Sequence, residues 1–317
     1  NGRRRQRQMC IRDRYYLNLI KLMSKTTSLI CALITTFIWG TAFIAQDTGM
    51  DNIGPLTFNA SRFFVGFLTV LPIALILERK KINYEINSNK KLFLKYLFLM
   101  GISLFLGTYL QQAALQYTNI VNAAFFTVFY VPLVPILLFF IYSIKVHWSL
   151  WPSIGLCIIG VYLLSDFSNS EIMIGDALVI LCSLFWALHI IFAGKFMEKF
   201  NIPIFYAALQ AALVFGLSLI FAFILEEVVI TKILTEYSSI LYAGVLSGGI
   251  AFTLQMFAQK NIEEAPAAII YSLEGVFATI AGWIILSQVL NMNNIIGCVL
   301  ILIAVIFSQI APTSKKS

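Results

Sequence analysis

The sequence predicts an all-α integral membrane protein with ten transmembrane helices in two inverted five-helix repeats. Three observations predict this fold: the composition, ten long apolar runs, and a segment that recurs in the second half. The chain has 317 residues, of which 60% are hydrophobic and 12% are charged. A soluble domain is about 45–50% apolar and about 25% charged. The composition therefore indicates that lipid surrounds most of the surface.

Ten apolar runs are long enough to cross a bilayer. A helix of roughly 20 apolar residues spans a hydrocarbon core of about 30 Å. Backbone polar groups in lipid need partners within the segment, and these runs lack the apolar–polar alternation of a membrane β-barrel. The predicted helices are 26–46, 57–77, 92–115, 120–142, 150–166, 174–194, 203–225, 238–259, 266–287 and 293–311.

One segment recurs between the third and fourth helices of each half. Ser103–Ala124 shares six identities with Ser247–Ala268, and Gln111 corresponds to Gln255. Because five crossings bring a chain to the opposite side of the membrane, the second set of five helices must be inverted. Inverted repeats of this kind are typical of secondary transporters.

Further positions correspond once the two halves are aligned. Pro55 and Pro203 open the second helix of each half, and Trp39 and Trp186 lie in the first helices. The alignment pairs charged residues with neutral polar ones: Arg62 corresponds to Gln210, and Glu274 to Tyr130. We therefore expect a shared frame around a cavity whose two ends differ.

The repeats set the predicted domain boundaries. The first repeat covers 26–166, the second covers 174–311, and a tail covers 312–317. A basic segment, 1–25, precedes them. Within it, Met9–Arg14 resembles translated adapter DNA, and Met23 is an alternative start. Two interpretations stay open for this segment: an artefact up to Lys21, or a basic cytoplasmic arm.

The distribution of basic residues predicts the orientation of the chain. With the N-terminus in the cytoplasm, all but three of the 22 Lys and Arg residues fall in cytoplasmic segments. The exceptions are Lys232 outside, and Arg62 and Lys95 within the helices. This is a positive-inside pattern with both termini cytoplasmic. The net charge of +7 is then a topology signal, and nucleic-acid binding is not expected, because no basic face is interleaved with aromatic residues.

No motif predicts an enzyme. The sequence has no G-x-S-x-G, no H-E-x-x-H and no Walker A loop. Four of the five cysteines lie singly within helices, and two histidines are too few for a typical metal cluster. We expect no metal and no cofactor, and uphill transport would have to use an ion or proton gradient.

Two charged residues lie deep within the predicted helices. Arg62 is about five residues into the second helix, and Glu274 lies near the middle of the ninth. A charge at this depth costs at least ~2.5–3.5 kcal/mol, so each must face protein or a water-filled cavity. Arg62 would attract an anionic group and Glu274 would bind a proton or cation. The alternative is a structural role in which each charge pairs with other helices.

Six neutral polar or aromatic residues complete the predicted substrate pathway. For the amides and for His189, packing between helices is the alternative to contact with a substrate. For the aromatic residues, the alternative is a position at the lipid surface. The six residues are Gln111, Gln255, Gln210, His189, Tyr130 and Trp39.

Four motifs resemble those of EamA-domain proteins of the drug/metabolite transporter superfamily. WGTAF at Trp39–Phe43 resembles the first-helix motif, and SRF at Ser61–Phe63 resembles the second-helix motif. LQQAALQYT at Leu110–Thr118 resembles the end of the third helix. SLEGVFA at Ser272–Ala278 resembles a ninth-helix pattern, in which Gly275 replaces the usual proline.

The resemblance implies a secondary transporter of small metabolites, often amino acids, that works by alternating access in a bacterial inner membrane. We therefore predict an exporter of small organic, amino-acid-like solutes with a coupling proton or cation. The alternatives are a membrane scaffold without transport and an intramembrane enzyme. The oligomeric state is not predicted.

Overall fold

The computed structural model describes residues 25–118, 120–164, 174–286 and 289–310. This part of the chain is helical and contains no β-strand. Most of the predicted basic segment 1–25, the joint between the repeats and the tail 312–317 lie outside the described residues.

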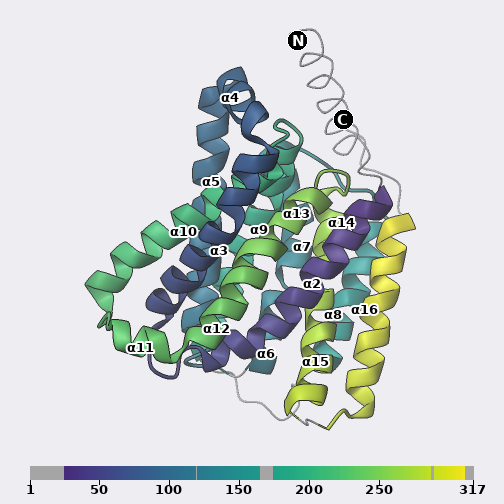
Figure 1. Ribbon diagram of the computed structural model, residues 1–317. Helices are drawn as coiled ribbons and strands as arrows, with labels where there is room; N and C mark the ends of the chain where they lie inside the picture. Colours follow the sequence, from purple (N-terminus) through teal and green to yellow (C-terminus); the bar gives the residue numbers. More distant parts are fainter. Residues whose placement is uncertain (1–24, 119, 165–173, 287–288, 311–317) are drawn as a thin grey trace, which may run out of the picture.

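The described residues of the first half form seven helices, which Figure 1 labels. They are α2 (Lys25–Thr48), α3 (Pro55–Leu77), α4 (Arg79–Ser88), α5 (Lys90–Ala114), α6 (Ile120–Thr127), α7 (Tyr130–Tyr142) and α8 (Leu150–Leu164). The second half contains α9 (Ile174–Met197), α10 (Pro203–Leu225), α11 (Ile230–Thr235), α12 (Tyr237–Leu241), the π-helix η2 (Tyr242–Ala251), α13 (Phe252–Ala258), α14 (Glu264–Tyr271), α15 (Leu273–Leu286) and α16 (Met292–Ile310).

The described residues contain nine helical segments that are long and apolar enough to cross a membrane. Each lies on one of the predicted runs. The remaining run corresponds to α8, which is also apolar but has only 15 residues. The chain is therefore an all-helical, multi-pass membrane protein, and the count of ten crossings stays a prediction.

Several predicted helices are interrupted. In the fourth run, α6 ends at Thr127 and α7 begins at Tyr130. The break lies close to Pro132, which has no N–H to donate to the carbonyl of Val128. The ninth run breaks at Ser272, between α14 and α15. The eighth run contains η2, in which Gly244 and Gly248 lie against α3. The predicted loop 78–91 is also mostly helical, as α4.

α4 and α11 mark opposite ends of the molecule (Figure 1), and we use them to name the α4 end and the α11 end. α3 packs along α10, and α8 packs along α16. α5 packs along α9, while α2 packs against η2, α13 and α15. Close approach requires glycine at Gly40, because a Cβ atom there would lie 2.6 Å from the carbonyl oxygen of Glu274.

α3 and α10 cap each other at opposite ends of the molecule. Each begins with proline at its first turn, where the missing N–H costs no hydrogen bond. Glu78, just after α3, accepts hydrogen bonds from the N–H groups of Ile204 and Phe205 at 3.2 and 2.7 Å. Glu226, just after α10, accepts from the N–H groups of Leu56 and Thr57, both at 2.8 Å.

These caps stabilise both helix N-termini, since a carboxylate there satisfies unpaired N–H groups and faces the positive end of the helix dipole. The hydroxyl of Thr57 also donates to Glu226, at 2.7 Å. A Cβ atom at position 54 would collide with the Glu226 carboxylate, so Gly54 leaves space for this cap. The reciprocal caps hold the α3–α10 pair at both ends.

Candidate functional site

A cavity lies inside the bundle, between the breaks in the fourth and ninth runs. Its volume is about 40 Å³, room for about three water molecules. Residues of α2, α3, α5, α6, α7, α9, η2, α13, α14 and α15 line it: Trp39, Phe43, Gln46, Arg62, Thr108, Gln111, Thr127, Tyr130, Trp186, Ile190, Ser247, Phe252, Gln255, Tyr271 and Glu274.

Six of the eight residues predicted for the substrate pathway line this cavity. They are Arg62, Gln111, Gln255, Glu274, Tyr130 and Trp39. The other two, His189 and Gln210, lie behind the wall and pair with each other, Nε2 to Oε1 at 3.1 Å. The His189 ring packs edge-on against Trp186 and Phe252, which do line the cavity.

Arg62 brings a buried positive charge to the cavity. Its side chain is 3% exposed, and Nε donates to Oδ1 of Asn59 at 2.8 Å. The guanidinium lies over the rings of Phe63 and Phe58, at 5.1 and 5.6 Å from their centres. Among the described residues it forms no ion pair, so a neutral amide and aromatic faces are its main compensation.

Glu274 brings a buried negative charge to the same cavity. It lies in the first turn of α15, directly after the break at Ser272, where the positive end of the helix dipole favours a carboxylate. The hydroxyl of Tyr130, the first residue of α7, donates to its Oε1 at 3.4 Å. Tyr130 and Glu274 each follow a helix break, so the two breaks meet at this contact, and the sequence alignment of the two halves pairs the same two residues.

Aromatic rings form part of the cavity wall. Trp39 lies 5.2 Å from Phe252, 5.5 Å from Tyr271 and 6.2 Å from Trp186, measured between ring centres. Phe252 and Trp186 stack nearly parallel. Trp39 and Trp186 are again equivalent positions in the two halves, and they meet at this wall.

Some polar atoms of the wall are unpaired. Among the described residues, Nε1 of Trp39, Oη of Tyr271 and Oε1 of Gln255 are buried without a hydrogen-bond partner. Buried polar groups in native proteins are almost always paired, with protein or with ordered water. The unpaired atoms therefore favour a polar occupant of the cavity.

The structure adds cavity residues that the predicted set lacked. Thr108, Thr127 and Ser247 line the cavity from α5, α6 and η2. Gln111 donates to the Thr127 hydroxyl at 3.2 Å, which ties α5 to α6. Small hydroxyl residues in an apolar run carry little signal, because they also bond to their own helix, as Thr127 does to the carbonyl of Ala123.

Comparisons with known proteins agree with this architecture. A curated relative from Archaeoglobus fulgidus, named an uncharacterized transporter, is 32% identical over 276 residues, 86% of this chain and 82% of that protein. The uncharacterized transporter YoaV of Bacillus subtilis is 24% identical over 89% of this chain and 96% of that protein. A solved crystal structure matches with a TM-score of 0.75 at 14% identity, over 90% of this chain and 98% of that one, which shows likeness of fold.

The apolar helices and these relatives define the chain as a multi-pass membrane transporter. The sequence pattern of the EamA-like transporter family matches residues 26–166 and 173–309. The chain belongs to this family, as the motifs in its first, second, third and ninth helices predicted. Membership implies a small-molecule substrate and a location within a bilayer.

Proposed function

We propose that the protein is a secondary carrier that exports small, amino-acid-like solutes by alternating access. The observation that carries the proposal is one cavity inside the bundle that is lined by both Arg62 and Glu274 and by aromatic rings. Two charges at membrane depth are costly, and such residues usually mark a substrate or ion pathway. A zwitterion would place its carboxylate near Arg62 and its ammonium near Glu274.

The proposed carrier has ten crossings in two inverted repeats, 26–166 and 174–311. Reciprocal contacts support this arrangement: Glu78 and Glu226 exchange caps, Trp39 meets Trp186, and Tyr130 meets Glu274. Alternating access in such folds is largely a movement of one repeat against the other around a fixed central site. The location is the inner membrane of a bacterium, with both termini in the cytoplasm.

In this proposal Glu274 also takes up the coupling proton. A carboxylate with one phenol partner, in a cavity with room for water, can exchange a proton with each side in turn. The substrate and the proton would then compete for the same group. That competition is the simplest coupling of export to a proton gradient.

The test is efflux from proteoliposomes loaded with a mixture of the twenty amino acids, with a proton gradient across the membrane. We expect the wild-type protein to release a subset of them, and Glu274→Gln to lower that release by at least about tenfold. Glu227→Gln is the matched control, because the Glu227 side chain is 82% exposed. Normal folding with unchanged efflux in Glu274→Gln would refute the role of Glu274, and absence of any efflux would favour the scaffold alternative.

A further inference from the structure

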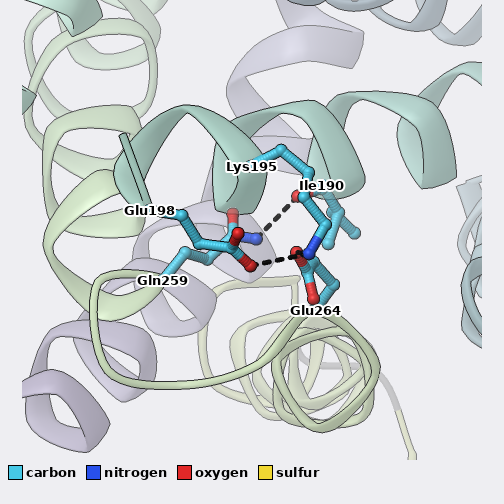
Figure 2. Close-up of polar contacts among 5 residues, drawn as sticks. All are labelled: Ile190, Lys195, Glu198, Gln259 and Glu264. Atoms are coloured by element: carbon cyan, nitrogen blue, oxygen red, sulfur yellow. Dashed lines mark hydrogen bonds and ion pairs between the residues drawn. The ribbon is translucent and has the colours of Figure 1, made fainter. Parts of the chain in front are cut away.

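A layer of polar groups, most of them buried, lies between the cavity and the α4 end, and Figure 2 shows its contacts. Nζ of Lys195 contacts Oε1 of Glu264 at 2.9 Å and Oε1 of Glu198 at 2.6 Å. Beside this cluster, Nε2 of Gln259 donates to the carbonyl oxygen of Ile190 at 2.7 Å. The layer therefore joins α9 to α14 and to the segment that follows α13.

The layer is continuous with the cavity wall. Lys195 follows the lining residue Ile190 by five residues, about 7.5 Å along α9. Gln259 accepts a hydrogen bond from the lining residue Gln255 at 3.1 Å. Glu264 lies at the start of α14, which reaches the cavity at Tyr271. Three segments thus run from the cavity into the same polar layer.

The ion pair between Lys195 and Glu264 is largely buried. Each residue is only 6% exposed. Gly194 allows the close approach, because a Cβ atom there would lie 2.7 Å from Cγ of Glu264. Burial of two charges costs about as much as their attraction returns, so the pair can separate once water reaches both groups. Such a contact suits an end of the cavity that must open and close.

Among the described residues, no ion pair equivalent to Lys195–Glu264 is found at the α11 end. The positions that correspond to Lys195 and Glu264 in the first half are Thr48 and Ile120. Of the ion pairs among described residues, Lys195–Glu198 lies within one helix and Glu227–Lys232 is exposed beside α11. Lys195–Glu264 is the one that joins two membrane-crossing segments.

We propose that Lys195 and Glu264 form the gate at the α4 end of the cavity, and that their ion pair separates when this end opens. The proposal rests on the proposed function, because a gate is needed by a carrier that exposes its cavity to each side in turn. It assigns Lys195 and Glu264 a positioning role: they hold α9 against α14 and contact no substrate.

The test measures water access to the cavity from each side. In a chain whose five native cysteines are replaced by serine, Ser247→Cys places one small reporter thiol on the cavity wall. A charged, membrane-impermeant methanethiosulfonate reagent is applied to inside-out and to right-side-out vesicles. We expect Glu264→Gln to raise the rate of labelling from the α4 side by about tenfold, with no rise from the α11 side.

Glu198→Gln is the matched control. It removes the closer of the two carboxylates that contact Lys195, but that carboxylate belongs to α9 itself, so labelling from the α4 side should stay at the parent rate. Lys195→Met breaks the same gate from the other partner and should act as Glu264→Gln does.

Equal rates in Glu264→Gln and its parent, a rise from both sides, or the same rise in Glu198→Gln would each overturn the gate. Failure of both Glu264→Gln and Lys195→Met to fold would also count against it, since a gate must tolerate separation of its partners. The readout needs no transported solute. Side-specific labelling without any amino-acid efflux would therefore overturn the proposed function and leave the gate standing.

Discussion

The two ends of the cavity can be compared contact by contact. At the α4 end, Lys195 and Glu264 join α9 to α14 through a buried ion pair, and Gln259 bonds to the carbonyl of Ile190. At the α11 end, Gln112 bonds to the carbonyl of Gln46 at 2.7 Å, and Thr118 donates to Asp176 at 2.5 Å.

The comparison distinguishes two kinds of contact. Contacts that occur at both ends form what we call the frame, and contacts that occur at one end and shut the cavity there are what we call closures. The amide-to-carbonyl bonds and the glutamate caps occur at both ends, so they belong to the frame. An ion pair between two crossing segments occurs at the α4 end, among the described residues. The ends should therefore differ most where charge is changed and least where only a neutral bond is lost.

The largest difference between the two ends should appear in how the stability of the fold depends on pH. Burial raises the pKa of Glu78 to about 7, and the hydrogen bonds from Phe205 and Ile204 and the charges of Lys81 and Lys260 lower it by less. A carboxyl group whose pKa is raised by folding stabilises the fold in its protonated form. Its contribution is complete below about pH 4.5 and falls as pH rises to about 7, by up to about 3 kcal/mol.

We therefore expect the melting temperature in detergent to fall between pH 5 and pH 8 more steeply in the wild type than in Glu78→Gln. The variant cannot ionise at this position, so it is the control for other titrating groups at the same end. Parallel pH profiles of the two proteins would show that Glu78 does not titrate in this range.

A smaller effect should follow from removal of the cap at the α11 end. Glu226→Ala removes three hydrogen bonds to the first turn of α3, and we expect a loss of about 2 kcal/mol. The measurement is the melting temperature at fixed pH. Glu227→Ala is the neighbouring control and should change it little. A Glu226→Ala protein as stable as this control would mean that the cap contributes nothing.

The smallest effects should come from the two neutral bonds. Gln112→Leu and Gln259→Leu each remove one amide-to-carbonyl bond between helices, worth about 0.6 kcal/mol in membrane proteins. Gln259→Leu should cost slightly more, since it also removes the acceptor of Gln255. Chemical denaturation of both variants tests this order. A large, unequal loss would show that these amides belong to the closures rather than to the frame.

Much of the fold could be predicted because lipid imposes simple rules. Apolar runs of helix length gave segments that the structure confirms as helices. The breaks within the fourth and ninth runs were not predicted. The break after Thr127 depends on Pro132 and on the contacts that replace the hydrogen bond that its missing N–H cannot make. At Ser272 the residue type itself does not indicate a helix break. The helix α4 was not predicted, because its residues 79–88 are mostly polar and show no clear helical periodicity of apolar residues.

The candidate site could be predicted in part, because the position of a charged residue within an apolar run shows how deep it lies in the membrane. Arg62 and Glu274 were identified in this way and do line one cavity. Depth gives no rotation about a helix axis, so His189 and Gln210 were placed on the pathway although they pair with each other behind the wall. Lys195 was expected in a cytoplasmic segment, and its burial in α9 depends on a partner, Glu264, far along the chain.

The contact between Tyr130 and Glu274 has a consequence for the ancestry of such a chain. If the two halves are inverted repeats, corresponding positions that also touch lie on the axis that relates them. In an ancestor built from two identical subunits, the same residue would have met its own copy there, as two carboxylates that repel or two phenols without charge. Fusion of such halves into one polypeptide would allow them to diverge, and a single ionisable acid could then occupy the axis with a neutral neighbour.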